Sequence, residues 1–211
     1  MKAESSYKTR IIKVKETSLE EVASVAADYL KKGKLIIYPT ETCYGLGADA
    51  LNEEAVKKVH DTKRQSYEKP ISVIVPDVEV AAKFGELDEE TKRLVKKFMP
   101  GPLTLIVKKR KEIPDLLSKE TIAFRISSNE IADRIAKEFD SGITATSANL
   151  HGEKEIYDSC EVIEKFNGKV DLIIDADTLE KNNPSTIYDA VNRKIIREGG
   201  IKEEEIEKVM E

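Results

Sequence analysis

The chain has 211 residues, of which 40% are hydrophobic and 36% are charged, and its formal net charge is −5. This composition is too apolar for a disordered chain, and the length suffices for one sizeable hydrophobic core. Ten glycines and seven prolines without a repeated tract exclude collagen-like and low-complexity proteins, and no apolar stretch is long enough to cross a bilayer. The polar N-terminus has no apolar run behind it and only two cysteines occur, so we expect a cytoplasmic protein without a secretory signal, a membrane span or a disulfide framework.

The two halves of the chain differ in charge. Residues 1–110 carry 21 Lys and Arg against 17 Asp and Glu, whereas residues 111–211 carry 14 against 23. An anionic ligand is therefore expected on the first half, although the excess is too small to identify a nucleic-acid binder by charge alone.

Apolar, β-branched runs recur along the chain, and each is predicted to be a strand: 10–14, 34–38, 71–76, 103–108, 121–126, 142–147, 170–175, 185–191 and 194–198. Helical spacing predicts helices between many of them, at 19–30, 52–62, 77–83, 88–98, 129–139, 158–166 and 201–211. Ser18 and Asn52 are the predicted caps of the first two helices. This alternation is typical of an α/β fold with a twisted sheet covered by helices. No Pro, Gly or Ser-rich linker divides the chain, so we expect a single domain over 1–211, with its core at about 10–200 and a short tail at 201–211.

The segment Tyr38-Pro-Thr-Glu-Thr-Cys-Tyr-Gly-Leu-Gly47 carries the strongest sequence signal for a site. Polar side chains crowd the end of an apolar strand beside two glycines, which indicates a ligand approached by the backbone. The segment lacks the Gly-Lys-Ser/Thr of a Walker A loop and the G-x-G-x-x-G of a dinucleotide fold. A Gly-rich turn without a ligand is the alternative.

Further polar motifs lie next to predicted strands. Lys63-Arg-Gln-Ser-Tyr-Glu-Lys-Pro70 places three cations before a strand, which suits a polyphosphate or a solvated loop. Arg125 ends an otherwise apolar strand, so it pairs either with a ligand carboxylate or with an internal acid. Small hydroxylic residues follow at 144–149 and 182–186, and Arg197 closes the last strand.

Six of these elements, taken in order, resemble the YrdC-type family of threonylcarbamoyl-AMP synthases over about residues 10–200. They are YPTETCYGLG, the K-R to K-P segment, PGPLT, the FR strand, TSAN and the PSTI to REG segment. The resemblance implies an open, twisted mixed sheet flanked by helices, with a large concave, positively lined cavity. It implies synthesis of threonylcarbamoyl-AMP and pyrophosphate from L-threonine, bicarbonate and ATP, as a step in the threonylcarbamoyladenosine modification of tRNA. The length suggests the short, single-domain form of the family.

The resemblance also implies the residues of the site. The threonine-binding residues would be Thr40, Ser72, Arg125, Ala145 and Ser185. The ATP-binding residues would be Lys63, Tyr67, Thr121, Ser147, Asn149 and Arg197. Lys63 and Arg125 would be the catalytic pair, and the loop 61–69 is the candidate lid.

Two details of this assignment stay open. Arg64 lies one place earlier than the arginine of the family's usual Lys-x-Arg pattern, which leaves its phosphate-binding role uncertain and Lys63 as the safer assignment. Ser185 and Thr186 are adjacent, and the sequence does not say which of them faces the site.

The implied chemistry needs no enzyme nucleophile, because an N-carboxythreonine attacks the α-phosphate of ATP. The protein would hold the reactants together and neutralise charge. Mg²⁺ is expected as the cofactor, held mainly by ATP phosphates and water without a named protein ligand. The expected partners are the three substrates and a downstream complex that transfers the threonylcarbamoyl group to tRNA.

Two other functions remain possible at this point. The chain could be an RNA-binding module that uses a basic concave surface, or a paralogue of the same fold without synthase activity. Dispersed cations and a steep salt dependence would favour RNA binding, whereas a small hydroxyl-rich pocket favours the enzyme.

Some reactive residues are expected to have no catalytic role. Cys43 is predicted to be a packed thiol, because no second cysteine or histidine lies nearby in sequence. His60 is expected to be partly exposed on a helix, and His151 to lie in a polar turn near the site. Asp175, Asp177 and Glu180 lack the spacing of a calcium loop and are expected to be solvated acids.

Overall fold

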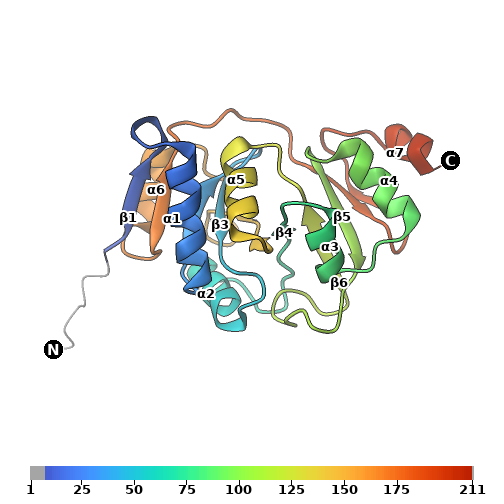
Figure 1. Ribbon diagram of the computed structural model, residues 1–211, viewed down its shortest axis with the longest axis horizontal. Helices are drawn as coiled ribbons and strands as arrows, with labels where there is room; N and C mark the ends of the chain where they lie inside the picture. The colour runs from blue at the N-terminus through green and yellow to red at the C-terminus, as the bar shows by residue number, and fades with distance from the viewer. Residues whose placement is uncertain (1–7, 211) are drawn as a thin grey trace.

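The computed structural model describes residues 8–210. Its described strands form two mixed sheets, and helices cover them, which confirms the predicted α/β class. The elements of the two sheets lie toward opposite ends of the molecule, with β1 at one end and α7 at the other (Figure 1).

The five-stranded sheet has the order β1-β9-β2-β3-β8. Its strands are β1 (Arg10–Lys13), β9 (Leu172–Asp175), β2 (Ile36–Pro39), β3 (Tyr44–Gly47) and β8 (Thr146–Ser147). The first three strands are parallel, and β3 runs antiparallel to both β2 and β8. Residues 44–47, which the sequence places in a Gly-rich loop, are therefore the second strand of a hairpin.

The six-stranded sheet has the order β11-β10-β5-β6-β4-β7. Its strands are β11 (Lys194–Arg197), β10 (Thr186–Asp189), β5 (Leu103–Lys108), β6 (Thr121–Arg125), β4 (Val73–Ile74) and β7 (Ile143–Thr144). The predicted strand at 71–76 is thus only two residues long.

A single predicted strand at 142–147 is wrong, because the chain crosses from one sheet to the other there. β7 pairs with β4 of the six-stranded sheet, and β8 pairs with β3 of the five-stranded sheet. Ala145 lies between the two short strands, at the point where the sheets meet.

The seven α-helices of the described residues are α1 (Leu19–Lys31), α2 (Glu53–Lys63), α3 (Val78–Phe84), α4 (Glu89–Phe98), α5 (Glu130–Phe139), α6 (Ser159–Phe166) and α7 (Glu203–Met210). Six of them, α1 to α6, start at a polar side chain that accepts a hydrogen bond from the backbone of the first turn. Ser18 accepts a hydrogen bond from the backbone of Glu21, and Asn52 accepts one from Ala55, as predicted. α1 and α5 pack side by side and cover one face of the five-stranded sheet (Figure 1).

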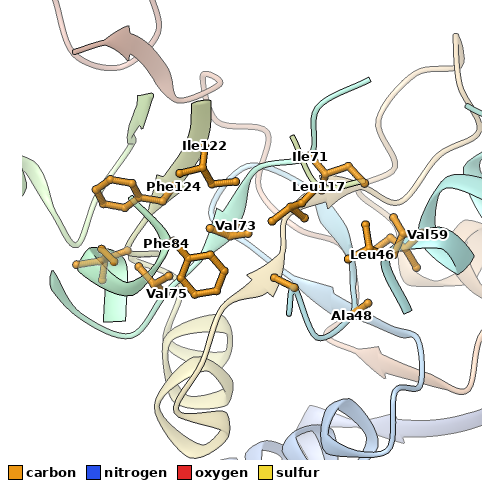
Figure 2. Close-up of a cluster of buried hydrophobic side chains, with 14 of the residues drawn as sticks. Leu46, Ala48, Val59, Ile71, Val73, Val75, Phe84, Leu117, Ile122 and Phe124 are labelled. Atoms are coloured by element: carbon orange, nitrogen blue, oxygen red, sulfur yellow. The ribbon is translucent and has the colours of Figure 1, made fainter. Parts of the chain in front are cut away.

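Two hydrophobic clusters form the core. Ile36 and Tyr38 of β2 face α1 and α5, whereas Ile37 faces the larger cluster, so both faces of this strand are buried. Figure 2 shows the larger cluster running from Phe124 of β6 through Val73 of β4 to Leu46 of β3 and Val59 of α2. The larger cluster therefore joins the two sheets and fixes the residues between them.

Candidate active site between the two sheets

A cavity of about 470 Å³ is lined by residues of both sheets. This volume is within the usual range for a small-molecule site. Its wall combines hydroxyl groups, two arginines and apolar residues: Thr40, Thr42, Cys43, Gly45, Pro70, Ser72, Thr104, Ile106, Ala123, Arg125, Ala145, Thr146, Ser147, Glu155, Tyr157, Asn182, Pro184, Ser185, Ile187, Ile196 and Arg197. Seven of the residues that the sequence assigns to substrates are among them.

Thr40 shapes the turn between β2 and β3. Its Oγ1 donates a hydrogen bond to the carbonyl of Cys43 at 2.7 Å and lies 3.1 Å from Oγ1 of Thr42. Its backbone N–H donates to the same carbonyl at 3.1 Å. The hydroxyl thus closes the turn that presents the polar motif to the cavity.

Arg125 extends from the end of β6 into the cavity wall. Its Nε lies 3.1 Å from Oε1 of Glu41, and each side chain is 11% exposed. Glu41 also accepts a hydrogen bond from Ser127 through Oε2. The internal salt bridge considered from the sequence is therefore present, and Arg125 lines the cavity as well.

Ser185, and not Thr186, faces the cavity. The Oγ of Ser185 lies 2.9 Å from Oγ1 of Thr104, and Arg197 donates to Ser185 O from Nε and Nη2 at 3.1 and 2.9 Å. Thr186 is fully buried, with its hydroxyl bound to the backbone near Ile201. Burial and the neighbouring charge of Arg125 lower the pKa of Arg197, as expected for two guanidinium groups that share one cavity.

Ser72 and Ala145 continue the β4–β7 pairing at the point where the chain crosses to the other sheet, and both line the cavity. Ser72 Oγ donates to the carbonyl of Ala145, and the N–H of Ala145 donates to the carbonyl of Ser72, both at 2.7 Å. The hydroxyl proton of Ser72 is used in this way, so its remaining capacity toward a ligand is to accept hydrogen bonds.

Lys63 lies behind the cavity wall at the end of α2. It is 2% exposed, and its Nζ donates to Ser147 O, to Asn149 O at 2.8 Å and to Asn149 Oδ1 at 3.1 Å. Burial, with a smaller contribution from Lys69, lowers the pKa of Lys63 to about 8. Lys63 and Asn149, each predicted to bind ATP, thus lie next to Ser147, but the ammonium group of Lys63 holds the loop 147–149 instead of facing the cavity.

Tyr67 and Thr121 lie outside this cavity. They line a separate hollow of about 270 Å³, which shares Pro70 with the main cavity. The hydroxyl of Tyr67 donates to Asp61 at 2.6 Å. Arg64 is exposed and ends α2 in the left-handed region at φ 52°, so it does not line the main cavity either.

His60 is not partly exposed, as the sequence suggested, but fully buried. The loop after α2 folds back over it, so Nδ1 lies 3.1 Å from Ser66 O, and Nε2 lies 2.9 Å from Leu116 O. Tyr67 packs edge-on against the ring at 5.5 Å. His60 therefore anchors the candidate lid loop from within the core.

Several cavity residues carry no role in the sequence interpretation. Glu155 and Tyr157 come from the irregular segment before α6, where neither periodicity nor a motif distinguishes them. Cys43 is buried, as predicted, and it also lines the cavity; burial raises the pKa of its thiol. His151 is exposed, and its Nδ1 lies 3.2 Å from Nζ of Lys69.

Among residues 8–210, no three His, Cys, Asp or Glu side chains are grouped so as to hold a metal ion. Asp177 forms an exposed ion pair with Lys15 at 3.0 Å, and Asp175 accepts a hydrogen bond from the backbone of Asp177. The same described residues contain no helix long and apolar enough to cross a membrane.

Sequence comparison relates the chain to known proteins. A family model described as "Telomere recombination", covering Sua5, YciO and YrdC, matches residues 28–199. A putative threonylcarbamoyl-AMP synthase of Methanocaldococcus jannaschii is 38% identical over 200 residues, which are 92% of this chain and 95% of that protein. The threonylcarbamoyl-AMP synthase of Pyrococcus abyssi is 37% identical over 209 residues, covering 96% of this chain but 61% of the longer relative.

Solved structures give the same relationship. A crystal structure of P. abyssi Sua5 complexed with L-threonine matches 96% of this chain and 61% of that chain, with a TM-score of 0.89 and 36% identity. The structure of E. coli YciO matches 92% of this chain and 97% of that chain, with a TM-score of 0.80 and 25% identity. These matches confirm the family expected from the ordered motifs. The chain belongs to the Sua5/YciO/YrdC family.

Proposed function

We propose that the chain is a threonylcarbamoyl-AMP synthase, which forms threonylcarbamoyl-AMP and pyrophosphate from L-threonine, bicarbonate and ATP. The cavity between the sheets carries this proposal, because it gathers two arginines and a set of hydroxyl groups around a space of small-molecule size. The relatives that bear this name, and the P. abyssi structure with L-threonine, support it.

In this proposal the threonine zwitterion lies between Arg125 and the part of the cavity lining formed by Ser72 and Ala145. The guanidinium group of Arg125 pairs with the carboxylate. Ser72 Oγ and Ala145 O can only accept from a ligand, since the Ser72 proton is already donated and a carbonyl has none. Acceptors suit the ammonium group, and Ser185 and Thr40 complete the pocket around the side chain.

The nucleotide would occupy the part of the cavity next to Arg197 and Ser147. Arg197 supplies positive charge to the phosphates from a position held by Ser185 O. Lys63 would reach a phosphate only by exchanging its contacts with Ser147 and Asn149, so we assign it first to holding this loop. Tyr67 and Thr121 would contact ATP only if it extended past Pro70 into the neighbouring hollow.

Mg²⁺ fits this site as a partner of ATP. Glu155 is the only carboxylate among the described residues of the cavity wall, so the ion would be held mainly by phosphate oxygens and water. Its contribution when bound is to neutralise charge on the phosphates.

The chemistry then depends on placement. The ammonium group of threonine first releases a proton to solvent, and the free amine then forms a bond to the carbon of bicarbonate. The hydroxyl group of bicarbonate leaves as water with a second proton from the nitrogen; where CO₂ has already formed from bicarbonate, that proton goes to solvent. The new carboxylate attacks the α-phosphorus, and pyrophosphate leaves. Holding three reactants in one cavity and matching their charges are the contributions of the protein. The product would pass, in the cytoplasm, to the complex that modifies tRNA.

Two other functions compete with this proposal. A non-synthase paralogue of the same fold would keep the cavity but lack threonine-dependent turnover. An RNA-binding module would need cations spread over a surface, whereas the cavity wall holds only two, Arg125 and Arg197, among the residues described.

Pyrophosphate release tests the proposal. The wild-type protein is assayed with Mg²⁺ and ATP while L-threonine and bicarbonate are omitted in turn, alongside Arg125→Ala. Arg134→Ala is the matched control, since Arg134 forms an exposed ion pair with Glu20 at 3.1 Å and neither residue lines the cavity. We expect release only with both additions, lost in Arg125→Ala and kept in Arg134→Ala. Release without threonine, or none in any mixture, would refute the proposal, and a salt-titrated RNA-binding curve would then test the RNA-binding alternative.

A further inference from the structure

Glu41 and Arg125 form a shielded ion pair at the edge of the cavity. Arg125 Nε and Glu41 Oε1 are 3.1 Å apart, and both atoms are inaccessible to solvent. The N–H does not point at the oxygen, so the pair lacks a well-formed hydrogen bond. Charge attraction between two desolvated groups therefore holds the arginine from its Nε side.

Glu41 is itself fixed by three parts of the chain. It belongs to the β2–β3 turn of the five-stranded sheet, and its Oε2 accepts from Ser127, which follows β6 of the six-stranded sheet. Asn182 Nδ2 donates to the backbone carbonyl of Glu41 at 3.1 Å. The carboxylate thus has little freedom to move, and it links the two sheets at the place where Arg125 enters the cavity.

The outer end of the guanidinium group is left for a ligand. Arg125 lines the cavity, and its terminal nitrogens have no hydrogen-bond partner among residues 8–210. A carboxylate that binds both terminal nitrogens approaches arginine end-on, which does not require the Nε side that Glu41 occupies. The internal acid and a ligand carboxylate can therefore bind Arg125 at the same time.

We infer that Glu41 is a positioning residue for recognition of the amino-acid carboxylate. It fixes the orientation of Arg125 before the substrate arrives, and Ser127 in turn fixes Glu41. This inference rests on the proposed function, since it takes threonine as the ligand of Arg125. A preorganised arginine loses less side-chain freedom on binding, so removal of Glu41 weakens threonine binding more than ATP binding.

Variants of Glu41 test the inference. Glu41→Ala removes the contact, and Glu41→Gln keeps an amide oxygen that can face Nε. The control is Glu20→Ala, because Glu20 and Arg134 also lie 3.1 Å apart but their side chains are 69% and 45% exposed. Threonine affinity is measured by calorimetry, KM for threonine and for ATP by pyrophosphate release, and Tm by thermal melting.

We expect Glu41→Ala to raise the Kd and KM for threonine about tenfold while KM for ATP stays unchanged. Glu41→Gln should bind threonine more tightly than Glu41→Ala but more weakly than the wild type. Ser127→Ala should raise the KM for threonine less than Glu41→Ala does, and Glu20→Ala should have the wild-type KM. An unchanged KM for threonine with a lowered Tm would show that Glu41 only stabilises the fold, which would overturn the inference.

Other outcomes would also contradict it. Tighter threonine binding in Glu41→Ala would mean that Glu41 competes with the ligand for Arg125. An equal increase of KM for threonine and ATP would mean general damage to the site. A wild-type protein that neither binds nor uses threonine would refute the proposed function itself. A wild-type protein that depends on threonine, with Glu41 variants that bind threonine equally well, would refute only the role of Glu41.

Discussion

The neighbours Ser185 and Thr186 provide a matched pair of hydroxyl groups with different roles. Both side chains are almost inaccessible to solvent, with 1% of Ser185 and 0% of Thr186 exposed, but Ser185 lines the cavity, whereas the hydroxyl of Thr186, the first residue of β10, is bound to backbone groups. We predict that Ser185→Ala impairs substrate binding with little loss of stability, and that Thr186→Val lowers stability without a direct effect on binding.

The cost of Thr186→Val follows from the bonds around one oxygen. Thr186 Oγ1 donates to Ile201 O at 2.6 Å and accepts from the N–H groups of Gly199 and Ile201 at 2.9 and 3.0 Å. Valine has nearly the same shape but leaves these three backbone groups without that partner. An unsatisfied buried polar group costs about 1–3 kcal/mol. Because water can reach the half-exposed Gly199 and replace its lost partner, we expect the free energy of unfolding to fall by about 2–4 kcal/mol. For a protein of this size, this corresponds to a decrease in Tm of about 5–15 °C.

Ser185→Ala removes a different set of contacts. The hydroxyl lies 2.9 Å from Thr104 Oγ1 and accepts from Arg197 Nη2 at 3.2 Å, but Arg197 keeps its two bonds to Ser185 O. Loss of one hydrogen bond to a ligand costs about 1–2 kcal/mol, which raises KM for threonine roughly 5- to 30-fold.

Thermal melting and threonine-dependent pyrophosphate release, measured on both variants, check the prediction. A Thr186→Val protein with the wild-type Tm would refute the account of its hydroxyl. A Ser185→Ala protein with wild-type KM but a large loss of Tm would show that the two roles are assigned the wrong way round.

Three further predictions concern the cavity and the lysine behind it. Lys63 should titrate near pH 8 in an NMR titration of ¹³C-labelled lysine, and a pKa near the ordinary 10.5 would contradict its burial. Because its pKa is lower in the folded state, the unfolded chain binds more protons between about pH 8 and 10.5, so this group's contribution to stability improves as pH rises through that range. Cys43→Ala should keep activity within about threefold and lose about 1 kcal/mol of stability by chemical denaturation, since its buried thiol acts as packing; an inactive variant would indicate a chemical role. Serine should be used with kcat/KM roughly 5- to 150-fold below threonine, because one methyl group is worth about 1–3 kcal/mol, and equal use of both amino acids would mean that the pocket does not contact the methyl group.

Much of the secondary structure follows from local patterns. The strands at 103–108 and 121–125 and the capped helices α1 and α2 agree with prediction, because apolar periodicity and capping act within a few residues. The hairpin strand at 44–47 was missed because its two glycines are typical of a loop, and its pairing with β2 and β8 depends on distant residues. The division of 142–147 between two sheets is likewise set by tertiary pairing, which no local pattern encodes.

The candidate site shows the same limit. The ordered motifs place Thr40, Arg125 and Ser185 on one cavity, because Thr40 and Arg125 lie where β2 and β6 end and Ser185 lies where β10 begins, all at the cavity between the sheets. Lys63 is different, since its side chain is long enough to turn away from the cavity and hold the loop at 147–149. The role of Glu41 also depends on a contact across 84 positions of sequence, which becomes visible only in the folded chain.

The most direct test of the proposed activity is identification of the product by mass spectrometry, after incubation of the wild-type protein with ATP, Mg²⁺, L-threonine and ¹³C-bicarbonate. We predict a threonylcarbamoyl-adenylate that carries the ¹³C label, formed with one pyrophosphate per molecule and absent when threonine is omitted. Release of pyrophosphate without a labelled adenylate, or an adenylate without the label, would contradict the account.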